Sequence, residues 1–301
     1  MIEKILKAVQ NNLEHWNTPE NLALCLSCID LTTLNTTDTA EKISSFTGKV
    51  NRFGGQFPKY PHPAAICVYP KWGGLVKQQL KVDGVKVAVV AGGFPHSQTF
   101  LEIKVAECRM AVEQGADEVD VVLPLNLFLS GDVKGAAEEI SAMKRAVGEK
   151  HLKVILETGA LQDVEQVKEA SMLAMEAGAD FIKTSTGKIE QGATPVAAIA
   201  MCQCIAEYYK KSGRKVGFKP AGGISNVKDA LCYLAIVETV LGREWCTPQL
   251  FRIGASRLAN NLLGALEQKT VGYYEKLDLY ERTCTWLRRP RARNCLESET
   301  E

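Results

Sequence analysis

The sequence has almost no net charge, no long apolar run and no apolar leader. Lysine and arginine number 36 against 35 aspartates and glutamates, a formal net charge of +1 over 301 residues. A charge this close to zero does not favour binding to nucleic acid or to an acidic membrane. No uninterrupted run reaches about 18 apolar residues, so we expect no membrane span. Residues 1–16 mix acidic, basic and apolar side chains, as an amphipathic helix does and a secretion signal does not. These features predict a cytoplasmic protein without a nucleic-acid or membrane partner.

Histidine is scarce, and the cysteines lack the spacing of a metal site. The four histidines are scattered, which predicts no metal cofactor: His15, His62, His96 and His151. Cys25 and Cys28 form one CxxC pair, but a zinc site needs a second pair. Several of the ten cysteines lie within apolar runs, such as Cys67 in AAICVYP. We therefore expect free, buried thiols in a reducing compartment rather than disulfides.

Short apolar runs rich in β-branched residues alternate with longer amphipathic stretches. From the third run onward they recur every 30 to 35 residues or so, roughly the length of one strand–helix unit. Eight such units predict an α/β fold, a (β/α)8 TIM barrel. A doubly wound open sheet is the alternative, but it usually has a glycine-rich turn after its first strand, where this chain has DLTTLNTTDTAEK. The predicted strands are residues 26–32, 64–70, 85–92, 118–124, 152–158, 181–187, 216–222 and 251–256.

The barrel does not account for the whole chain. We expect residues 1–20 to form an N-terminal helical extension and residues 21–275 to form the barrel. Residues 51–63, NRFGGQFPKYPHP, are interpreted as an irregular insertion. Residues 276–301 carry a basic run and then an acidic one, which predicts a flexible, solvated tail rather than a nucleic-acid contact.

Two lysines end apolar strands, where a charged side chain is costly to bury. Lys183 lies in FIKTSTGK and Lys219 in VGFKPAGG. Because side chains alternate along a strand, Asp120 in EVDVV can point into the barrel together with both lysines. Two amines about 5 Å apart repel by roughly 3 kcal/mol at an effective dielectric of about 20, or about two pKa units. The repulsion favours a neutral amine that can form an imine with a carbonyl substrate. The alternative is that each lysine pairs with a carboxylate and only supports the barrel.

Glycine-rich segments follow the last three predicted strands. Gly187 and Lys188 lie at the end of the sixth, Gly222 and Gly223 at the end of the seventh, and Ser256 at the end of the eighth. Loops at these places in this fold commonly bind phosphate through backbone N–H groups and a helix N-terminus. Any one of these glycines can be a plain turn residue. Their recurrence at successive strand ends favours a phosphorylated substrate.

The same segments, in combination and in order, resemble those of a known family. AAICVYP, GADEVDVVLP, LKVILETG, GADFIKTSTGK and VGFKPAGGI occur between IDLTTLN (29–35) and FRIGAS (251–256). With them the chain resembles the deoxyribose-phosphate aldolases, of the longer eukaryotic-like type, over most of the predicted barrel. The resemblance implies a class I aldolase, a carbon–carbon lyase that uses no cofactor or metal. It implies reversible cleavage of 2-deoxy-D-ribose 5-phosphate to D-glyceraldehyde 3-phosphate and acetaldehyde, in deoxyribonucleotide catabolism.

The resemblance also assigns roles to residues. Lys183 is the Schiff-base nucleophile, Lys219 lowers its pKa, and Asp120 relays protons with a water molecule. The substrate and its phosphate are assigned to Gly187, Lys188, Gly222, Gly223 and Ser256, with Cys67 and Asp30 beside the substrate.

The chain departs from the family pattern at two positions and in its tail. Arg257 stands where relatives often have a serine or a threonine, and Ser225 stands where they often have an arginine. Some members use a C-terminal tyrosine in proton transfer, for which the candidates here are Tyr273, Tyr274 and Tyr280.

Other functions stay open from the sequence alone. A catalytically inactive barrel that binds sugar phosphates would not need both lysines and the aspartate. Another Schiff-base aldolase or a transaldolase would act on a different sugar phosphate with the same lysines. A metal-dependent aldolase would need a set of metal-binding side chains, which the spacing of the histidines and cysteines does not supply. A homo-oligomer is compatible with each of these functions.

Overall fold

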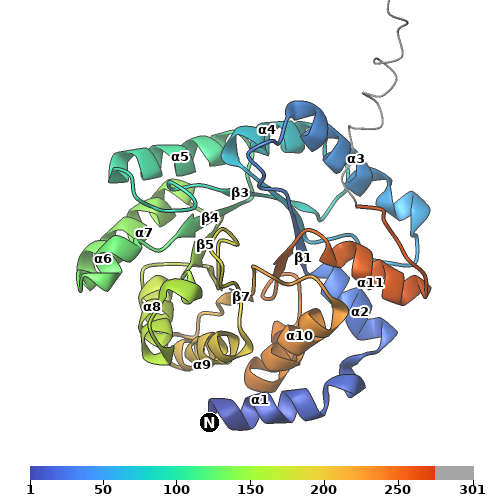
Figure 1. The fold of residues 1–301 in the computed structure, drawn as a ribbon. Coiled ribbons are helices and arrows are strands. Elements are labelled where there is room, and N and C mark those ends of the chain that lie inside the picture. The colour runs from blue at the N-terminus through green and yellow to red at the C-terminus, as the bar shows by residue number, and fades with distance from the viewer. Residues whose placement is uncertain (275–301) are drawn as a thin grey trace, which may run out of the picture.

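Eight parallel strands form a ring with helices around it in the computed structural model, which describes residues 1–274 (Figure 1). Neighbouring strands pair in the order β7-β6-β5-β4-β3-β2-β1-β8, and bridges from Phe218 to Phe251 and from Ala221 to Gly254 link the two ends. This confirms the predicted (β/α)8 barrel over the doubly wound sheet. The strands are β1 (Ile29–Thr32), β2 (Ala65–Val68), β3 (Lys86–Val90), β4 (Glu118–Val122), β5 (His151–Ile155), β6 (Phe181–Lys183), β7 (Gly217–Lys219) and β8 (Ile253–Ala255).

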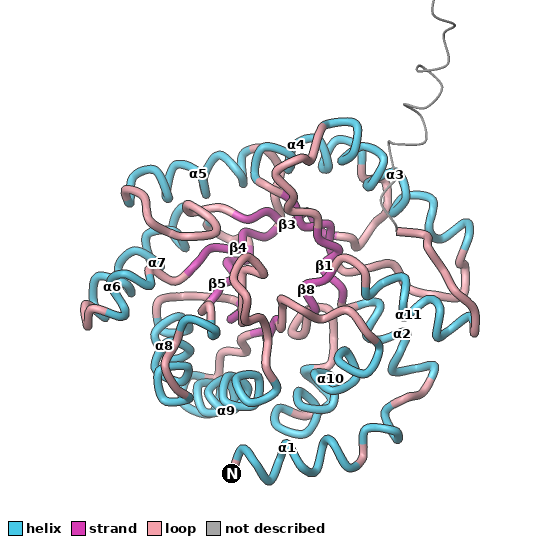
Figure 2. Tube along the Cα trace, in the orientation of Figure 1, coloured by secondary structure: helices cyan, strands magenta, loops and turns pink. Residues whose placement is uncertain are grey.

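The helices lie outside the ring of strands (Figure 2). Several begin at a polar side chain that accepts a hydrogen bond from an amide of the first turn: Thr39, Asp132, Asp163, Thr194 and Asn226. Such caps stabilise a helix N-terminus. The helices are α1 (Ile2–Asn11), α2 (Pro19–Ser27), α3 (Ala40–Gln56), α4 (Pro70–Gln79), α5 (Leu101–Glu113), α6 (Leu125–Leu129), α7 (Val133–Val147), α8 (Val164–Glu176), α9 (Pro195–Ser212), α10 (Val227–Leu241) and α11 (Leu258–Glu267).

The N-terminal helix is additional to the barrel, as predicted. α1 packs along α9 and α10 (Figure 1), and a short 3-10 helix, Leu13–Trp16, leads from it to α2. The domain boundaries at residues 20 and 275 stay predictions, and the predicted tail, residues 276–301, lies outside the described residues. Within residues 1–274, no helix has the length and apolar character needed to cross a membrane.

The strands are shorter than the predicted runs. β6 ends at Lys183 and β7 ends at Lys219, so the residues after each lysine already belong to loops. The first predicted strand, residues 26–32, is wrong at its start, because Leu26 and Ser27 are the last residues of α2. Lys183 and Lys219 therefore stand at the edge of the sheet, where the loops begin.

The predicted irregular insertion at residues 51–63 is wrong over its first part. α3 continues to Gln56, and only the residues after it are irregular. Val50 and Phe53 lie one helical turn apart, and both are fully buried. Their packing outweighs the low helix propensity of Gly54 and Gly55, which misled the prediction.

Side-chain alternation divides the buried strand residues into two layers. Val119 and Val121 of β4 belong to the main apolar core, between the strands and the helices. The alternate residues point into the ring, where Val90 of β3 is the register partner of Asp120. On β2 and β3 the inward residues are small and apolar and form a separate cluster with Leu34: Ala65, Cys67, Ala88 and Val90. The interior of the barrel thus has an apolar side, on β2 and β3, and a charged side to which β4 to β7, Asp30 of β1 and Arg252 before β8 contribute.

Candidate active site

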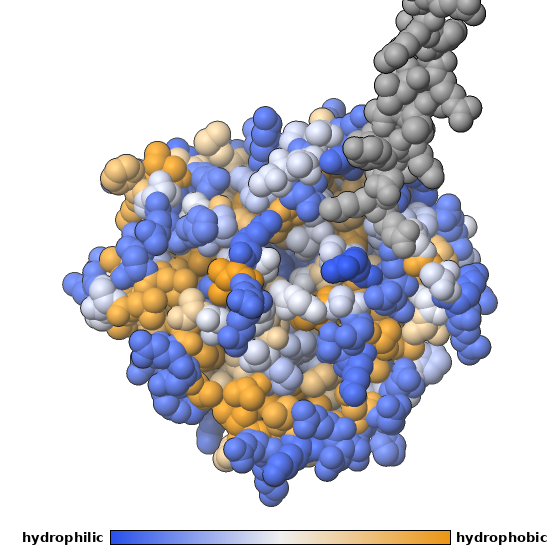
Figure 3. Space-filling view, viewed as in Figure 1, coloured by the Kyte–Doolittle hydropathy of each residue, from blue (hydrophilic) through white to orange (hydrophobic). Residues whose placement is uncertain are grey.

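A cavity of about 600 Å³ opens at the carboxyl ends of the strands. Its wall is formed by the loops that follow β1, β6, β7 and β8 and by part of α3. Seen from the side of Figure 1, hydrophilic side chains lie around the centre of the ring (Figure 3). Active sites of this fold form at this end of the barrel. The wall includes Lys183 and residues 32–35, 186–188, 221–225 and 254–257.

Asp120 joins three buried lysines. Its Oδ2 atom lies 2.9 Å from Lys183 Nζ and 2.7 Å from Lys219 Nζ, and its Oδ1 atom lies 3.0 Å from Lys153 Nζ. The strand register places Lys183 and Lys219 directly opposite each other on β6 and β7. Only Lys183 has measurable exposure among these four residues, at 3%. The structure thus brings together Asp120, Lys183 and Lys219, and adds Lys153 to them.

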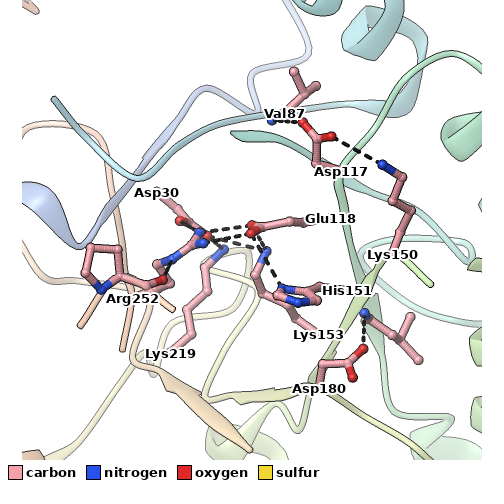
Figure 4. A network of polar contacts seen from close by, with 12 residues as sticks. Asp30, Val87, Asp117, Glu118, Lys150, His151, Lys153, Asp180, Lys219 and Arg252 are labelled. Atoms are coloured by element: carbon pink, nitrogen blue, oxygen red, sulfur yellow. Dashed lines mark hydrogen bonds and ion pairs between the residues drawn. The ribbon is translucent and has the colours of Figure 1, made fainter. Parts of the chain in front are cut away.

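A second layer of charges adjoins this group (Figure 4). Asp30 lies 2.5 Å from Lys219 and 2.6 Å from Arg252. Glu118 lies 2.6 Å from Lys153 and 2.7 Å from Arg252. Each carboxylate therefore has at least two cationic partners, as buried charges require. No group of three or more His, Cys, Asp or Glu side chains within residues 1–274 is arranged to hold a metal ion.

The buried network contains one more base than acid. Its paired acids and bases balance: Asp30, Glu118 and Asp120 against Lys153, Lys219 and Arg252. Lys183 is the additional base. His151 Nδ1 lies 3.8 Å from Glu118, but burial lowers the pKa of His151, so this residue adds no charge at neutral pH. If Lys183 is neutral, the network as a whole is neutral.

The pKa shifts within the network also distinguish Lys183 from the other bases. Burial lowers the pKa of Lys183; Asp120 opposes the decrease, and the Lys219 ammonium adds to it. Burial also acts to lower the pKa of Lys219, but Asp120 and Asp30 outweigh it and raise that pKa well above its usual value. Burial would raise the pKa of Asp120, but the surrounding ammonium groups of Lys153, Lys183 and Lys219 hold it well below its usual value. Lys183, which lines the cavity, is therefore the lysine whose neutral form is favoured.

Backbone geometry after β6 and β7 suits the close approach of an anion. Gly187, Gly222 and Gly223 line the cavity. Gly222 has a φ of 89°, and a Cβ atom there would meet Gly192 Cα at 2.9 Å, so only glycine fits. Gly223 has a φ of 80°, and a Cβ atom there would have no atom within 4 Å, so the backbone N–H groups beside it are uncovered and can face a bound phosphate. Ser256 lies exposed in the same cavity wall, directly after β8.

The remaining predicted site residues differ in how they meet the cavity. Lys188 lines it, and its Nζ donates a hydrogen bond at 2.5 Å to the carbonyl oxygen of Leu34, which lines the cavity from the β1 loop. Cys67 and Asp30 are fully buried and do not belong to the cavity wall. Burial raises the pKa of Cys67, which keeps the thiol protonated. Asp30 contacts Lys219 rather than the space available to a substrate.

The three candidate tyrosines also differ in position. Tyr274 lines the cavity. Tyr273 donates a hydrogen bond from its hydroxyl to the Lys49 carbonyl oxygen at 2.6 Å and is not part of the cavity wall. Tyr280 lies outside the described residues.

Three charged residues of the network were missing from the predicted site. Lys153 lies in LKVILE and Arg252 in FRIGA, so each interrupts an apolar strand segment. That is the signal that marks Lys183 and Lys219, and it was sufficient to find both. Glu118 shares a strand face with Asp120, two residues away, which was its only signal.

Glu157 holds the loop that follows β6. It is 4% exposed and has a left-handed backbone conformation, with φ 53° and ψ 57°. Its carboxylate accepts hydrogen bonds from the Thr186 backbone N at 3.1 Å and from Thr186 Oγ1 at 2.5 Å. Thr186 Oγ1 in turn accepts from the Lys188 backbone N at 3.0 Å. These bonds fix the segment that carries Gly187 and Lys188.

The chain matches known proteins over most of its length. A family model described as DeoC/LacD family aldolase matches residues 24–246. The chain is 44% identical to a deoxyribose-phosphate aldolase of Bos taurus and 43% identical to one of Homo sapiens, each over 263 residues. Each alignment covers 84% of this chain and 83% of the relative.

Solved structures with the same fold include two aldolases. The tetrameric deoxyribose phosphate aldolase of Aeropyrum pernix is 28% identical, with a TM-score of 0.63, over 86% of this chain and 96% of that one. An aldolase named QR15 is 30% identical, with a TM-score of 0.65, over 81% of this chain and 96% of that one.

Proposed function

This chain belongs to the DeoC/LacD family of aldolases, and we propose that it is a deoxyribose-phosphate aldolase in which Lys183 forms the Schiff base. It cleaves 2-deoxy-D-ribose 5-phosphate reversibly to D-glyceraldehyde 3-phosphate and acetaldehyde, a reaction of deoxyribonucleotide catabolism. The observation that carries the residue assignment is the position of Lys183. It is a buried base in excess over the carboxylates around it, its pKa is lowered, and it lines the cavity.

The neutral amine of Lys183 starts the reaction. It adds to C1 of the open-chain aldehyde to give a carbinolamine, and loss of water gives a protonated imine. Asp120 Oδ2, 2.9 Å from Lys183 Nζ, stabilises the positive charge that forms on this nitrogen. Lys219 stays protonated because Asp120 and Asp30 both pair with it. Its charge disfavours protonation of free Lys183 and so keeps the nucleophile available.

The imine then accepts the electrons of the C2–C3 bond. As a base removes the proton of the C3 hydroxyl, the C2–C3 bond breaks, glyceraldehyde 3-phosphate leaves, and an enamine is left on Lys183. The enamine takes a proton at C2, and water hydrolyses the resulting imine to acetaldehyde and free lysine. We assign these proton transfers to Asp120 acting through a water molecule, because its carboxylate is ionised but is not itself in the cavity wall.

Reduction of the imine tests the assignment of Lys183. The protein is incubated with 2-deoxyribose 5-phosphate and borohydride, and the adduct is located by peptide mass spectrometry. We expect one adduct, on Lys183, and none in Lys183→Arg. Lys188→Arg serves as the control for a neighbouring lysine and keeps the adduct. An adduct on another lysine, or none in the folded wild-type protein, would overturn the mechanism.

Two further properties are proposed with the function. The eight cysteines among the described residues are all free thiols, which supports a cytoplasmic location. The tetrameric Aeropyrum pernix relative supports a homo-oligomer, which light scattering of the purified chain tests.

A further inference from the structure

One end of the cavity lies where the β7 and β8 loops meet the N-terminus of α11. Gly222–Ser225 follow β7, and Ser256 and Arg257 follow β8; all of them line the cavity. Asn261 of α11 links this helix to the β7 loop, because its Nδ2 donates a hydrogen bond to the Ser225 carbonyl oxygen at 2.6 Å.

Arg257 is an exposed cation in this part of the cavity wall. Within residues 1–274 its guanidinium takes part in no ion pair or hydrogen bond, and only its backbone carbonyl oxygen accepts hydrogen bonds, from the amides of Asn260 and Asn261. Arg252, five residues earlier, is by contrast buried and bonded to Asp30 and Glu118. The fork of donors on Arg257 is therefore available to a ligand.

The surroundings of Arg257 favour an anionic ligand. Arg257 is the N-cap of α11, a helix of 10 residues, and no side chain caps that end. The first amides of the helix and its dipole thus face the same region with positive charge.

The carboxylates of the cavity wall lie elsewhere, before and within α3. Asp38 accepts hydrogen bonds from Thr33 Oγ1 and from the Asn35 backbone N, which hold it within the β1 loop. Glu41 lies in the first turn of α3. Within residues 1–274, the α11 end of the wall therefore presents Arg257 with no carboxylate beside it in the chain or among the wall residues around it.

We propose that Arg257 binds the phosphate of the substrate and makes the enzyme discriminate in favour of phosphorylated aldehydes. The proposal rests on the proposed aldolase function and goes beyond it, since the backbone amides of Gly222 and Gly223 would bind phosphate with or without this side chain. A phosphate monoester presents two negative charges and three acceptor oxygens, which the guanidinium matches in a bidentate manner. The unphosphorylated sugar offers no such group, so Arg257 affects only the phosphorylated substrate.

Steady-state kinetics on two substrates tests the discrimination. Arg257→Ala is compared with wild type on 2-deoxyribose 5-phosphate and on 2-deoxyribose. We expect kcat/KM for the phosphorylated substrate to fall about tenfold, mostly through KM, from the loss of one charge-assisted hydrogen-bonded pair. The value for 2-deoxyribose stays unchanged, and Arg257→Lys recovers part of the loss. Equal losses on both substrates, or no loss on either, would overturn the proposal.

A matched control separates Arg257 from general surface charge. Lys269 is an exposed cation that follows α11, is paired with Glu267 at 3.1 Å, and does not line the cavity. Lys269→Ala removes the same charge and should leave both substrates unaffected. A loss in Lys269→Ala as large as that in Arg257→Ala would refute a specific phosphate contact.

Calorimetry with inorganic phosphate makes the proposal independent of turnover. We expect inorganic phosphate to bind wild type about tenfold more tightly than Arg257→Ala, with weaker binding at high salt. This result supports the phosphate contact even if borohydride trapping fails to place a Schiff base on Lys183. Equal phosphate affinity in the two proteins contradicts it even if trapping succeeds.

Discussion

Replacing Lys219 by methionine tests why Lys183 is reactive. Methionine has about the length of lysine and fits a fully buried position, and it removes the charge. The Nζ atoms of Lys183 and Lys219 contact the same Asp120 oxygen, at 2.9 and 2.7 Å. Two donors on one oxygen at ordinary angles are about 4.5 Å apart. At an effective dielectric of about 20, two unit charges at that distance repel by about 3.7 kcal/mol, which is about two to three pKa units.

The sign of the effect follows from the charge count. Without Lys219, the three carboxylates face only Lys153, Arg252 and Lys183, so a protonated Lys183 now balances the network. The pKa of Lys183 therefore rises in Lys219→Met. At neutral pH the fraction of neutral Lys183 falls by about 100-fold or more, and raising the pH restores it. The same balance predicts that the variant folds, because each carboxylate keeps at least one partner.

Single-turnover formation of the borohydride-trappable imine measures the shift. Its rate is followed from about pH 6 to about pH 10, across the range in which a perturbed lysine titrates. We expect the rising limb of Lys219→Met to lie at least about two pH units above that of wild type. Lys104→Met is the matched control, because Lys104 is also buried but pairs with Glu139, outside the barrel network.

A Lys219→Met protein that folds and keeps the wild-type limb would refute the reasoning. Burial is the largest cause of the lowered pKa of Lys183, and it is unaffected by this substitution. An unmoved limb would mean that burial alone sets the reactivity of Lys183. A limb moved to lower pH would contradict the charge count itself.

Two other predictions concern the support of the site. Glu157→Ala leaves the buried Thr186 amide and hydroxyl without their carboxylate partner, so the free energy of unfolding should fall by about 1–3 kcal/mol. KM for 2-deoxyribose 5-phosphate should rise more than kcat falls. Urea unfolding measures the stability, and steady-state kinetics measures KM and kcat. A variant with wild-type stability and wild-type kinetics would contradict the role of Glu157 in holding the loop. The pKa values of Asp30, Glu118 and Asp120 are lowered because neighbouring cations outweigh burial. At pH values above the unfolded-state pKa values of about 4, the ionised carboxylates stabilise the folded protein. This contribution is lost as the pH falls through the lower pKa values of the folded state. Acid unfolding, followed by circular dichroism, should therefore begin below about pH 4. A transition complete above that pH would contradict the ion pairing.

The alternation of apolar and charged residues made most of the fold predictable. Each strand is short and mostly buried, and parallel strands covered on both sides are apolar enough to be recognised. The side of the strand on which each residue lies was also predictable. Asp120 and Lys183 point into the barrel, whereas the alternate residues face the helices: Val119, Val121 and Ile182. The ends of the strands were not predictable. Whether a residue after Lys183 extends the strand or begins a loop depends on whether the neighbouring chain segment offers it backbone hydrogen bonds.

Tertiary contacts explain what the sequence could not reveal. Glu157 follows an apolar strand and precedes Thr158 and Gly159, a context that resembles an ordinary strand end. Its left-handed backbone is held by Thr186, which is 29 residues away. A non-glycine residue in that conformation persists only where its surroundings stabilise it. Local sequence therefore contains no signal for it.

The two interpretations of the strand-end lysines turn out to apply to different residues. Taken singly, a lysine in an apolar strand is either a base paired with a carboxylate or a nucleophile, and the sequence does not distinguish them. The network contains both kinds. Lys153 and Lys219 each contact two or more carboxylates. Among the carboxylates of residues 1–274, Lys183 contacts only Asp120, through an oxygen that it shares with Lys219. Because three acids cannot neutralise four bases in a buried site, one base is favoured in its neutral form. The lysine with the fewest partners and access to the cavity is the one that can lose its proton at the least cost, and this makes Lys183 the nucleophile.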